Sequence, residues 1–471
     1  MSFEMMSSVV RVLLGKTDSS ANGFTYGLLF SIGVYVTAPT VLSLIGFGAK
    51  FTEDSDNKRM DKYTPGLSNP ANECFINSSL QALSSLDYLT AYLHDALLLL
   101  SPEEEDVEKN EGTGVLLTRS LSDIVGQLQT VTCAPQTLSN KQFVRSLERI
   151  FRGRMSRTQN DAHEFTQLLV DTLESENVTV LAPLCDETAL KFPFEGETTS
   201  FSVCLKCKQY SEVSAQKFLI HELVVPKKSD AHLEDILTDG DSELIEDYSC
   251  LYCQITAILT NESNTTKPPT GFEAEMVGSL QSLLPDLKIN TALPDTLLDY
   301  VKSYRKGNCN TSILKTAIIR RTAISNAPSI LSLHLSRSMF NGASFTRNPC
   351  RVEYPETLIV LQRDVENGTA ERITYRLRSM IKHTGTHYSG HYQCYKHKPD
   401  LVKLMGTGVT VNRSPTVLAR PPMIQERVKT PKSVRRWPYW FISDAVVRES
   451  NAGKMLRESK YVYMLFYERV L

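Results

Sequence analysis

The sequence lacks a strong excess of charge and lacks the dense cysteine content of a disulfide-stapled protein. Its 471 residues carry 51 Lys and Arg against 53 Asp and Glu. Overall charge therefore gives no reason to expect a nucleic-acid partner. Ten cysteines are scattered along the chain, and four of them form two C-x-x-C pairs. That pattern favours metal ligands and reactive thiols in a reducing compartment over a disulfide scaffold.

Charge is also missing from one continuous stretch, Ser19–Ala49. Within it, residues 24–48 are mostly apolar and long enough to cross a bilayer, which takes about 20 residues. A cleaved signal peptide usually has a shorter apolar run, a mitochondrial presequence would be Arg-rich and acid-poor, and a buried core helix is the remaining alternative. We predict one N-terminal transmembrane helix at 24–48, preceded by a short segment (1–23) and followed by a linker (49–62). The Lys and Arg of the linker predict that the long C-terminal part faces the cytosol.

The globular part, 63–471, changes character along its length. Helical periodicity dominates up to about residue 185, and β-branched alternation begins near Phe192, so we predict an α+β fold. Residues 261–310 read as an insertion rich in Asn, Thr and Pro, with a weak helix at 293–304. Residues 396–436 read as a basic insertion, which is either a solvated loop or a contact with anionic lipid.

One stretch begins with turn formers and ends on a cysteine, Cys74, which an apolar-periodic run follows. This pattern places Cys74 at or near a helix N-terminus. The free N–H groups and the helix dipole there favour the thiolate, which is the nucleophilic form of cysteine. A buried structural cysteine is the alternative.

The two C-x-x-C pairs are Cys204/Cys207 and Cys250/Cys253. Such pairs can present four thiolates in the tetrahedral arrangement of a structural Zn²⁺ site. Because they are 42 residues apart, we expect the metal to join two distant β-hairpins. The alternative is four ordinary reduced thiols.

Three histidines, His383, His387 and His391, recur at a spacing of four with glycines between them. This spacing indicates either a strand-loop-strand site or a metal cluster. A further histidine, His334, lies on an apolar alternating segment and reads as a hydrogen-bonded core residue.

Taken in order, these segments resemble the ubiquitin-specific proteases, the papain-like deubiquitinases. The resemblance is carried by a cysteine box (66–83), the box Gln159-Asn160-Asp161-Ala162-His163-Glu164-Phe165, Pro193-Phe194-Glu195-Gly196 before the first C-x-x-C pair, a histidine box (383–395) and an aromatic C-terminal strand. It implies a papain-like cysteine protease fold of thumb (about 63–185), fingers (about 195–330) and palm (about 330–471). Ubiquitin and ubiquitinated proteins are the implied partners, and no cofactor is implied for catalysis.

The resemblance also implies site residues. Cys74 would be the nucleophile, His391 its base, and Asn69 the oxyanion donor. Asp161 would hold the basic C-terminal tail of ubiquitin, with Gln159 and Tyr392 as further substrate-binding residues. For Asp161, a helix N-cap is the alternative.

The sequence departs from the family pattern at three positions. Ala71 and Glu73 stand where the family usually has glycine and threonine, and the charge of Glu73 would oppose thiolate formation unless it points to solvent. Ser443 fills the position of the residue that orients the histidine, with Asp444 next to it. On this register we expect Ser443→Ala to lower kcat more than Asp444→Ala does.

Ser443, the span and the short N-terminus together resemble the mitochondrial outer-membrane branch of the family. That branch implies a protein of the outer mitochondrial membrane with its catalytic domain in the cytosol; the ER membrane is the alternative address. Two other functions stay open. One is a catalytically weak or dead ubiquitin-binding scaffold, suggested by Ala71 and Glu73, and the other is a peptidase for a ubiquitin-like modifier.

Overall fold

The computed structural model describes residues 59–470 except for 71, 101–113, 154–159, 185–189, 240–241, 266–268, 341, 343, 365–367, 387–388, 405–409 and 413–427. From Asp61 onward these residues form one compact unit. The segments predicted at 1–23 and 24–48, most of the linker 49–62, and Ala71, Gln159 and His387 lie outside the described residues. Within the described ranges, no helix is long and apolar enough to cross a membrane.

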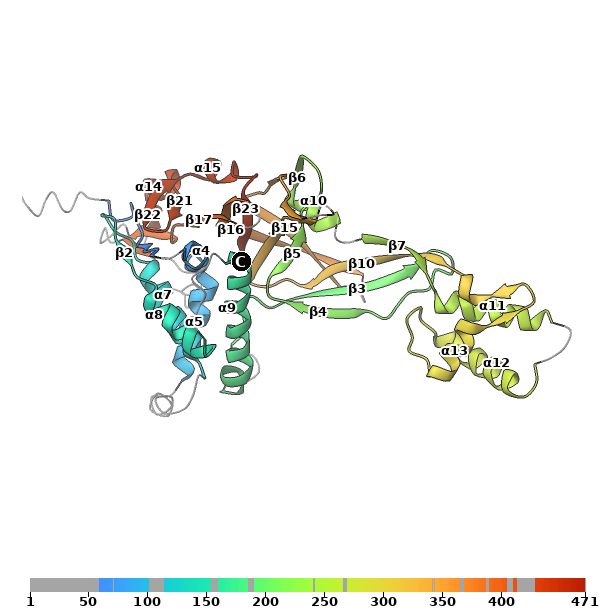
Figure 1. Ribbon diagram of the computed structural model, residues 1–471. Helices are drawn as coiled ribbons and strands as arrows, with labels where there is room; N and C mark the ends of the chain where they lie inside the picture. Colours follow the sequence, from blue (N-terminus) through green and yellow to red (C-terminus); the bar gives the residue numbers. More distant parts are fainter. Residues whose placement is uncertain are drawn as a thin grey trace, which may run out of the picture. The chain divides into compact units, whose positions relative to one another are not determined.

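Five helices fill the region expected to form the thumb (Figure 1): α4 (Cys74–Leu83), α5 (Asp87–Leu99), α7 (Leu116–Leu128), α8 (Lys141–Ile150) and α9 (Ala162–Glu176). All ten residues of α4 are buried, since the other helices and the sheet surround it. Phe75 of α4 packs edge-on against Phe165 of α9, with ring centroids 5.5 Å apart. Apolar burial of this kind holds the start of α4 and the start of α9 in one rigid cluster.

A mixed sheet of eight strands lies against these helices: β5 (His221–Val224), β11 (Ile330–Ser336), β15 (Thr357–Asp364), β16 (Thr369–Gly385), β17 (Gly390–His397), β21 (Tyr439–Ser443), β22 (Val446–Ser450) and β23 (Val462–Arg469). The strand order is β22-β21-β17-β16-β23-β11-β5, and β15 also pairs with β16. Side chains alternate between its two faces, as strand geometry requires. Cys394 belongs to the core shared with the helices, and Tyr395 belongs to a second core.

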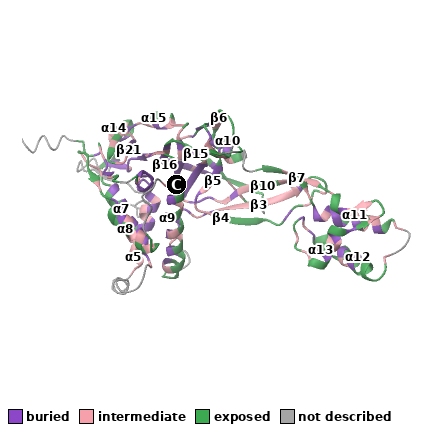
Figure 2. Ribbon diagram, in the orientation of Figure 1, coloured by how far each residue is buried: buried purple, intermediate pink, exposed green. Residues whose placement is uncertain are grey.

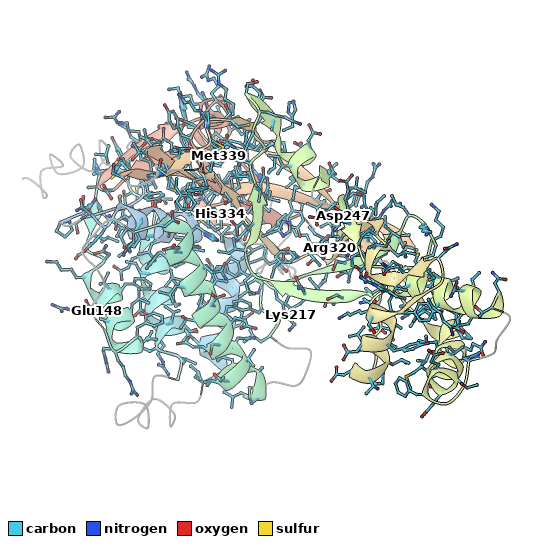
Figure 3. The ribbon with its side chains drawn as sticks, turned by 45° about the vertical axis from the view of Figure 1, so that its right-hand side comes forward. Glu148, Lys217, Asp247, Arg320, His334 and Met339 are labelled. Atoms are coloured by element: carbon cyan, nitrogen blue, oxygen red, sulfur yellow. The ribbon has the colours of Figure 1, made fainter. Side chains whose placement is uncertain are left out.

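The region expected to form the fingers begins with a four-stranded sheet in the order β4-β3-β10-β7: β3 (Gly196–Cys204), β4 (Ser214–Phe218), β7 (Ser242–Tyr248) and β10 (Thr316–Asn326). Figure 2 shows that this sheet is mostly half-buried or exposed, in contrast with the eight-stranded sheet. Exposed charges such as Lys217 and Arg320, labelled in Figure 3, lie on its strands.

Three helices lie between β7 and β10 in the chain: α11 (Leu251–Ser263), α12 (Phe272–Leu283) and α13 (Asp295–Ser303). They share a small hydrophobic core of their own. The sequence predicted α13 but missed α11 and α12, because α11 is rich in β-branched Ile and Thr, whose helix propensity is low. Burial of Ile255 and Ile258 in that core overrides the local preference.

The remaining elements are short: β1 (Gly66–Leu67), β2 (Thr137–Leu138), η1 (Asn177–Leu181), η2 (Ala182–Leu184), β6 (Asp230–His232), α10 (Leu233–Asp239), η3 (Leu284–Asp286), β8 (Arg305–Lys306), β9 (Cys309–Asn310), η4 (Thr311–Ile313), β12 (Ser338–Phe340), β13 (Phe345–Arg347), β14 (Arg351–Glu353), β18 (Leu401–Leu404), β19 (Thr410–Asn412), β20 (Val428–Lys429), α14 (Lys432–Arg436) and α15 (Ala452–Leu456).

The basic insertion predicted at 396–436 begins later than expected. Lys396 and Lys398 are fully buried in the palm. Lys398 Nζ contacts Asp61 at 3.0 Å and Glu449 at 2.7 Å, so its charge is neutralised inside the fold. These two cations are therefore structural, and a boundary at residue 396 is wrong.

Candidate active site

Cys74 is the first residue of α4, and the loop before it is fixed against the turn that follows β21. The backbone N–H of Leu67 donates to the carbonyl of Asp444 at 3.0 Å. A Cβ on Gly66 would come within 2.7 Å of the Ala445 backbone, so this approach requires glycine. The predicted position of Cys74 at a helix N-terminus is confirmed.

The Cys74 thiol is a poor acid in this position. Burial raises its pKa above the ordinary value, and the Asp444 carboxylate raises it further, although backbone N–H groups of Tyr392 and Phe75 act in the opposite direction. At neutral pH the resting side chain is therefore the thiol. Attack on a carbonyl requires a base that removes this proton during the reaction.

His391, the predicted base, lies on β17 one residue before Tyr392. Its Nε2 lies 2.9 Å from Ser443 Oγ, which leaves Nδ1 as the nitrogen that can take a proton. The next residue, Tyr392, contacts the Cys74 thiol through its backbone N–H. The Cys74 thiol therefore lies beside β17, at the residue that directly follows His391.

Ser443 orients the imidazole, but a hydroxyl alone does not fix the tautomer, because it can donate to Nε2 or accept from Nε2–H. Gln393 Nε2 donates to the same Oγ at 3.2 Å. Asp444 Oδ2 lies 3.9 Å from His391 Nε2, and its negative charge favours the form that carries a proton there. That form leaves Nδ1 unprotonated.

Asp444 has a second set of contacts, which sequence reasoning missed. The backbone of Asp444 has a φ of +50°. Its carboxylate accepts hydrogen bonds from Asn69 Nδ2 at 3.0 Å and from Asn77 Nδ2 at 2.8 Å. The carboxylate therefore fastens the side chain of Asn69 beside the start of α4. Each asparagine amide has two N–H groups, so Asn69 keeps one for another acceptor.

Glu73, whose charge was expected to oppose thiolate formation unless it points to solvent, is not among the main groups that shift the pKa of the Cys74 thiol. Asn140, which is fully buried, donates to Glu73 Oε2 at 2.8 Å and to Asn77 Oδ1 at 3.0 Å. The backbone N–H of Glu73 donates to Asn69 Oδ1 at 2.8 Å. The carboxylate that raises the pKa of Cys74 is that of Asp444, and Glu73 instead helps to close a ring of hydrogen bonds around the start of α4.

Asp161 is the N-cap of α9, which was the alternative to a role in ubiquitin binding. Its Oδ1 caps α9 by accepting from the backbone N–H groups of His163 at 2.6 Å and Glu164 at 3.3 Å. Its Oδ2 accepts from the hydroxyls of Tyr392 at 3.0 Å and Tyr463 at 2.6 Å. Tyr392 is buried, so in this conformation its hydroxyl supports Asp161 from within the fold.

Two other predicted histidines are structural. The His383 ring stacks on Tyr392 with centroids 4.3 Å apart and packs against Gly390, where no Cβ could fit. His334, labelled in Figure 3, stacks on His163 at 3.7 Å. Neither of its ring nitrogens has a hydrogen-bond partner among the described residues, so the prediction of a hydrogen-bonded core histidine is wrong.

The structure thus joins Asn69, Asn77, His391, Ser443 and Asp444 through hydrogen bonds and one charge contact beside Cys74, with Asp161 and Tyr392 next to them. Three residues that contact this group were not predicted, namely Asn77, Asn140 and Tyr463. Asn77 lies three residues after the cysteine, within the cysteine box, but a single sequence contains no signal for its partner Asn140, the residue just before α8.

A second group lies at the far end of the fingers sheet. The sulfurs of Cys204, Cys207, Cys250 and Cys253 all lie within 4.8 Å of one another. Two of the separations are 3.8 Å and 3.7 Å, and four sulfurs at about 2.3 Å from a tetrahedral metal would be about 3.8 Å apart. The donor set therefore fits a metal ion such as zinc.

The sequence predicted that both cysteine pairs lie in β-hairpins, but the second pair does not. Cys250 caps the N-terminus of α11 and Cys253 lies in its first turn. Residues three apart on a helix face the same side, so the pair still presents both sulfurs together. The cluster joins the end of β3 to the start of α11.

The family model described as "Ubiquitin carboxyl-terminal hydrolase" matches residues 65–467. Ubiquitin carboxyl-terminal hydrolase 16 of Saccharomyces cerevisiae is 36% identical over 94% of this chain and 96% of that protein. The protein of the same name from Emericella nidulans is 30% identical over 74% of this chain and 65% of that protein.

Among solved structures, one chain of the SAGA DUB module bound to ubiquitin aldehyde superposes with a TM-score of 0.50 at 18% identity, over 91% of this chain and 76% of that chain. This likeness shows the fold, and it confirms the predicted α+β, papain-like architecture. Together with the family match, it leads to one conclusion: the chain belongs to the ubiquitin carboxyl-terminal hydrolase family, and it is a cysteine-type deubiquitinase.

Proposed function

We propose that this chain hydrolyses the bond that follows the C-terminal glycine of ubiquitin, with Cys74 as nucleophile and His391 as base. The observation that carries the proposal is the group of contacts beside Cys74. Ser443 and Asp444 both lie near His391 Nε2, and the Asp444 carboxylate also accepts a hydrogen bond from Asn69. A structure solved with ubiquitin aldehyde shares this fold, which supports ubiquitin as the substrate.

In the proposed mechanism, His391 Nδ1 takes the proton of the Cys74 thiol as the sulfur attacks the glycine carbonyl. The backbone N–H of Cys74 and the free N–H of Asn69 Nδ2 donate to the oxyanion that forms. When the intermediate collapses, His391 gives its proton to the departing lysine amine, and a thioester remains on Cys74. A water molecule, deprotonated by His391, then hydrolyses the thioester and releases ubiquitin.

Asp161 would receive the basic tail of ubiquitin in this proposal. Its carboxylate is held in place by the two tyrosine hydroxyls and by the α9 cap, so it needs no rearrangement to present its charge. Gln159 stays a proposed substrate contact on sequence grounds alone, since it lies outside the described residues.

The proposal is tested with ubiquitin that carries a fluorogenic amide at its C-terminus. We expect hydrolysis by the wild-type chain and none by Cys74→Ala. The scaffold alternative predicts binding without hydrolysis in both. Faster release from a ubiquitin-like modifier with the same reporter would favour the other peptidase alternative.

We further propose that residues 24–48 anchor the enzyme in the outer mitochondrial membrane, with the ER membrane as the alternative. The support is the uncharged stretch and the cations that follow it. Deleting residues 1–50 should move the protein from the membrane pellet to the soluble fraction while kcat toward fluorogenic ubiquitin stays within about twofold, because Asp61–Leu471 is a compact unit by itself. Unchanged membrane sedimentation, or loss of activity, would contradict a simple anchor.

A further inference from the structure

A cavity of about 800 Å³ lies on the palm, away from the candidate catalytic residues. Its walls come from β16, the end of β17, α14, the start of α15, the end of β23 and the start of α5. Cavities that hold small ligands are usually about 300–1,000 Å³. This one has the size of a ligand site, and its lining includes five arginines: Arg376, Arg378, Arg435, Arg436 and Arg469.

The floor of the cavity is neutralised by internal ion pairs. Arg378 is buried and contacts Asp87 at 2.6 Å, Glu468 at 3.1 Å and Asp400 at 3.4 Å. Glu468 also accepts the backbone N–H of Tyr88, at the start of α5. The carboxylates of the floor are therefore already paired with Arg378, whose positive charge is balanced inside the fold.

The wall formed by α14 is different. Arg435 and Arg436 are exposed, and within the described chain neither of them pairs with a carboxylate. Arg435 donates only to the carbonyl of Thr430, at 3.5 Å, and Arg436 lies against the Trp437 ring. Among the described residues, these two guanidinium groups at the edge of the cavity thus have no carboxylate partner.

The other rim groups do not supply that anion. Glu356 accepts the Tyr439 hydroxyl at 3.0 Å, and Arg469 lies 3.9 Å from Glu371. Arg376 lies 3.8 Å from Asp400 and donates to His397. Arg435 and Arg436 on α14 and the partly exposed Arg376 are therefore the arginines of this cavity that a ligand is most free to contact.

We propose that this cavity binds a small polyanion that carries phosphate groups, held chiefly by Arg435 and Arg436. The planar guanidinium fork matches phosphate oxygens in paired hydrogen bonds, and several such contacts favour a ligand with more than one phosphate. The two arginines close the basic segment in which the sequence already suggested contact with anionic lipid. The ligand could be the headgroup of a membrane lipid or a soluble phosphate ester of the same chemistry.

The test uses the full-length chain in neutral detergent and inositol hexakisphosphate as the soluble probe. Binding is measured by calorimetry at fixed ionic strength. We expect saturable binding, and an affinity at least about tenfold weaker for Arg435→Gln/Arg436→Gln. The matched control is Lys429→Gln/Lys432→Gln, which removes the same charge from exposed residues of the same segment that do not line the cavity.

A second readout is tryptic cleavage after Arg435 and Arg436, which bound phosphate should slow. The full-length chain is inserted into phosphatidylcholine vesicles with or without a phosphoinositide. Protection that appears only with the phosphoinositide assigns the ligand to a lipid headgroup, and protection by the soluble probe alone assigns it to a free phosphate ester. Absence of binding in both arms, or an equal loss in the two double variants, would overturn the site.

Discussion

Asp444→Ala is expected to lower kcat toward fluorogenic ubiquitin by about 10²–10³, the loss associated with one oxyanion-hole donor. The carboxylate of Asp444 holds Asn69 at 3.0 Å and Asn77 at 2.8 Å, and it lies 3.9 Å from His391 Nε2. Its removal frees the Asn69 amide, the proposed oxyanion donor, from one of its two hydrogen bonds, and it also removes a negative charge beside His391. KM should change little, because neither effect concerns the resting contact with ubiquitin.

Ser443→Ala is the variant whose kcat is compared with that of Asp444→Ala. Its loss removes one hydrogen bond to His391, at 2.9 Å, and leaves both asparagines in place. We therefore expect a smaller loss of kcat, about tenfold. The sequence alone favoured the opposite order, and a larger effect of Ser443→Ala with unchanged melting of both variants would restore that order.

Loss of the bound metal is expected to have the largest effect on stability. We propose that the four-cysteine cluster holds one structural zinc ion, which would join β3 to α11. In Cys204→Ser one of the four thiolate ligands is missing, so the three remaining cysteines bind the metal ion less tightly. Because structural zinc sites contribute folding free energy directly, we expect the fingers to lose about 5 kcal/mol or more of stability.

The control for this variant is Cys309→Ser, a cysteine of the same region that is not part of the cluster. Zinc content is measured by elemental analysis, and opening of α11 is followed by amide hydrogen exchange. Wild type and Cys309→Ser should each contain one zinc per chain, while Cys204→Ser should contain less and exchange faster in α11. Equal exchange in all three, with no metal bound, would refute the zinc proposal.

Local pattern was enough to place several elements of this fold. The apolar period after Cys74 predicted α4, and β-branched alternation predicted the change from helices to strands near residue 192. These predictions succeed because periodicity reports which face of an element is buried. The helices α11 and α12 were missed because their stability comes from a small shared core, which local propensity does not report.

In the candidate site too, local pattern predicts some residues and misses others. Asn69 and Cys74, which are five positions apart, were both predicted from the cysteine box. The contact of Asn140 with Glu73 joins positions 67 residues apart. Likewise, the exposed run of cations predicted at 396–436 begins with Lys396 and Lys398, whose burial depends on partners elsewhere in the fold. Single-sequence reasoning sees residue types but not the partners that change their role.

The central claim is that Cys74 is the nucleophile that attacks the C-terminal carbonyl of ubiquitin. It is tested most directly with ubiquitin that carries an electrophile in place of its C-terminal glycine carboxylate. The account predicts one covalent adduct per chain, mapped by peptide mass spectrometry to Cys74 and absent from Cys74→Ala. An adduct on another cysteine, such as Cys133 or Cys309, or no adduct with a folded wild-type chain, would contradict it.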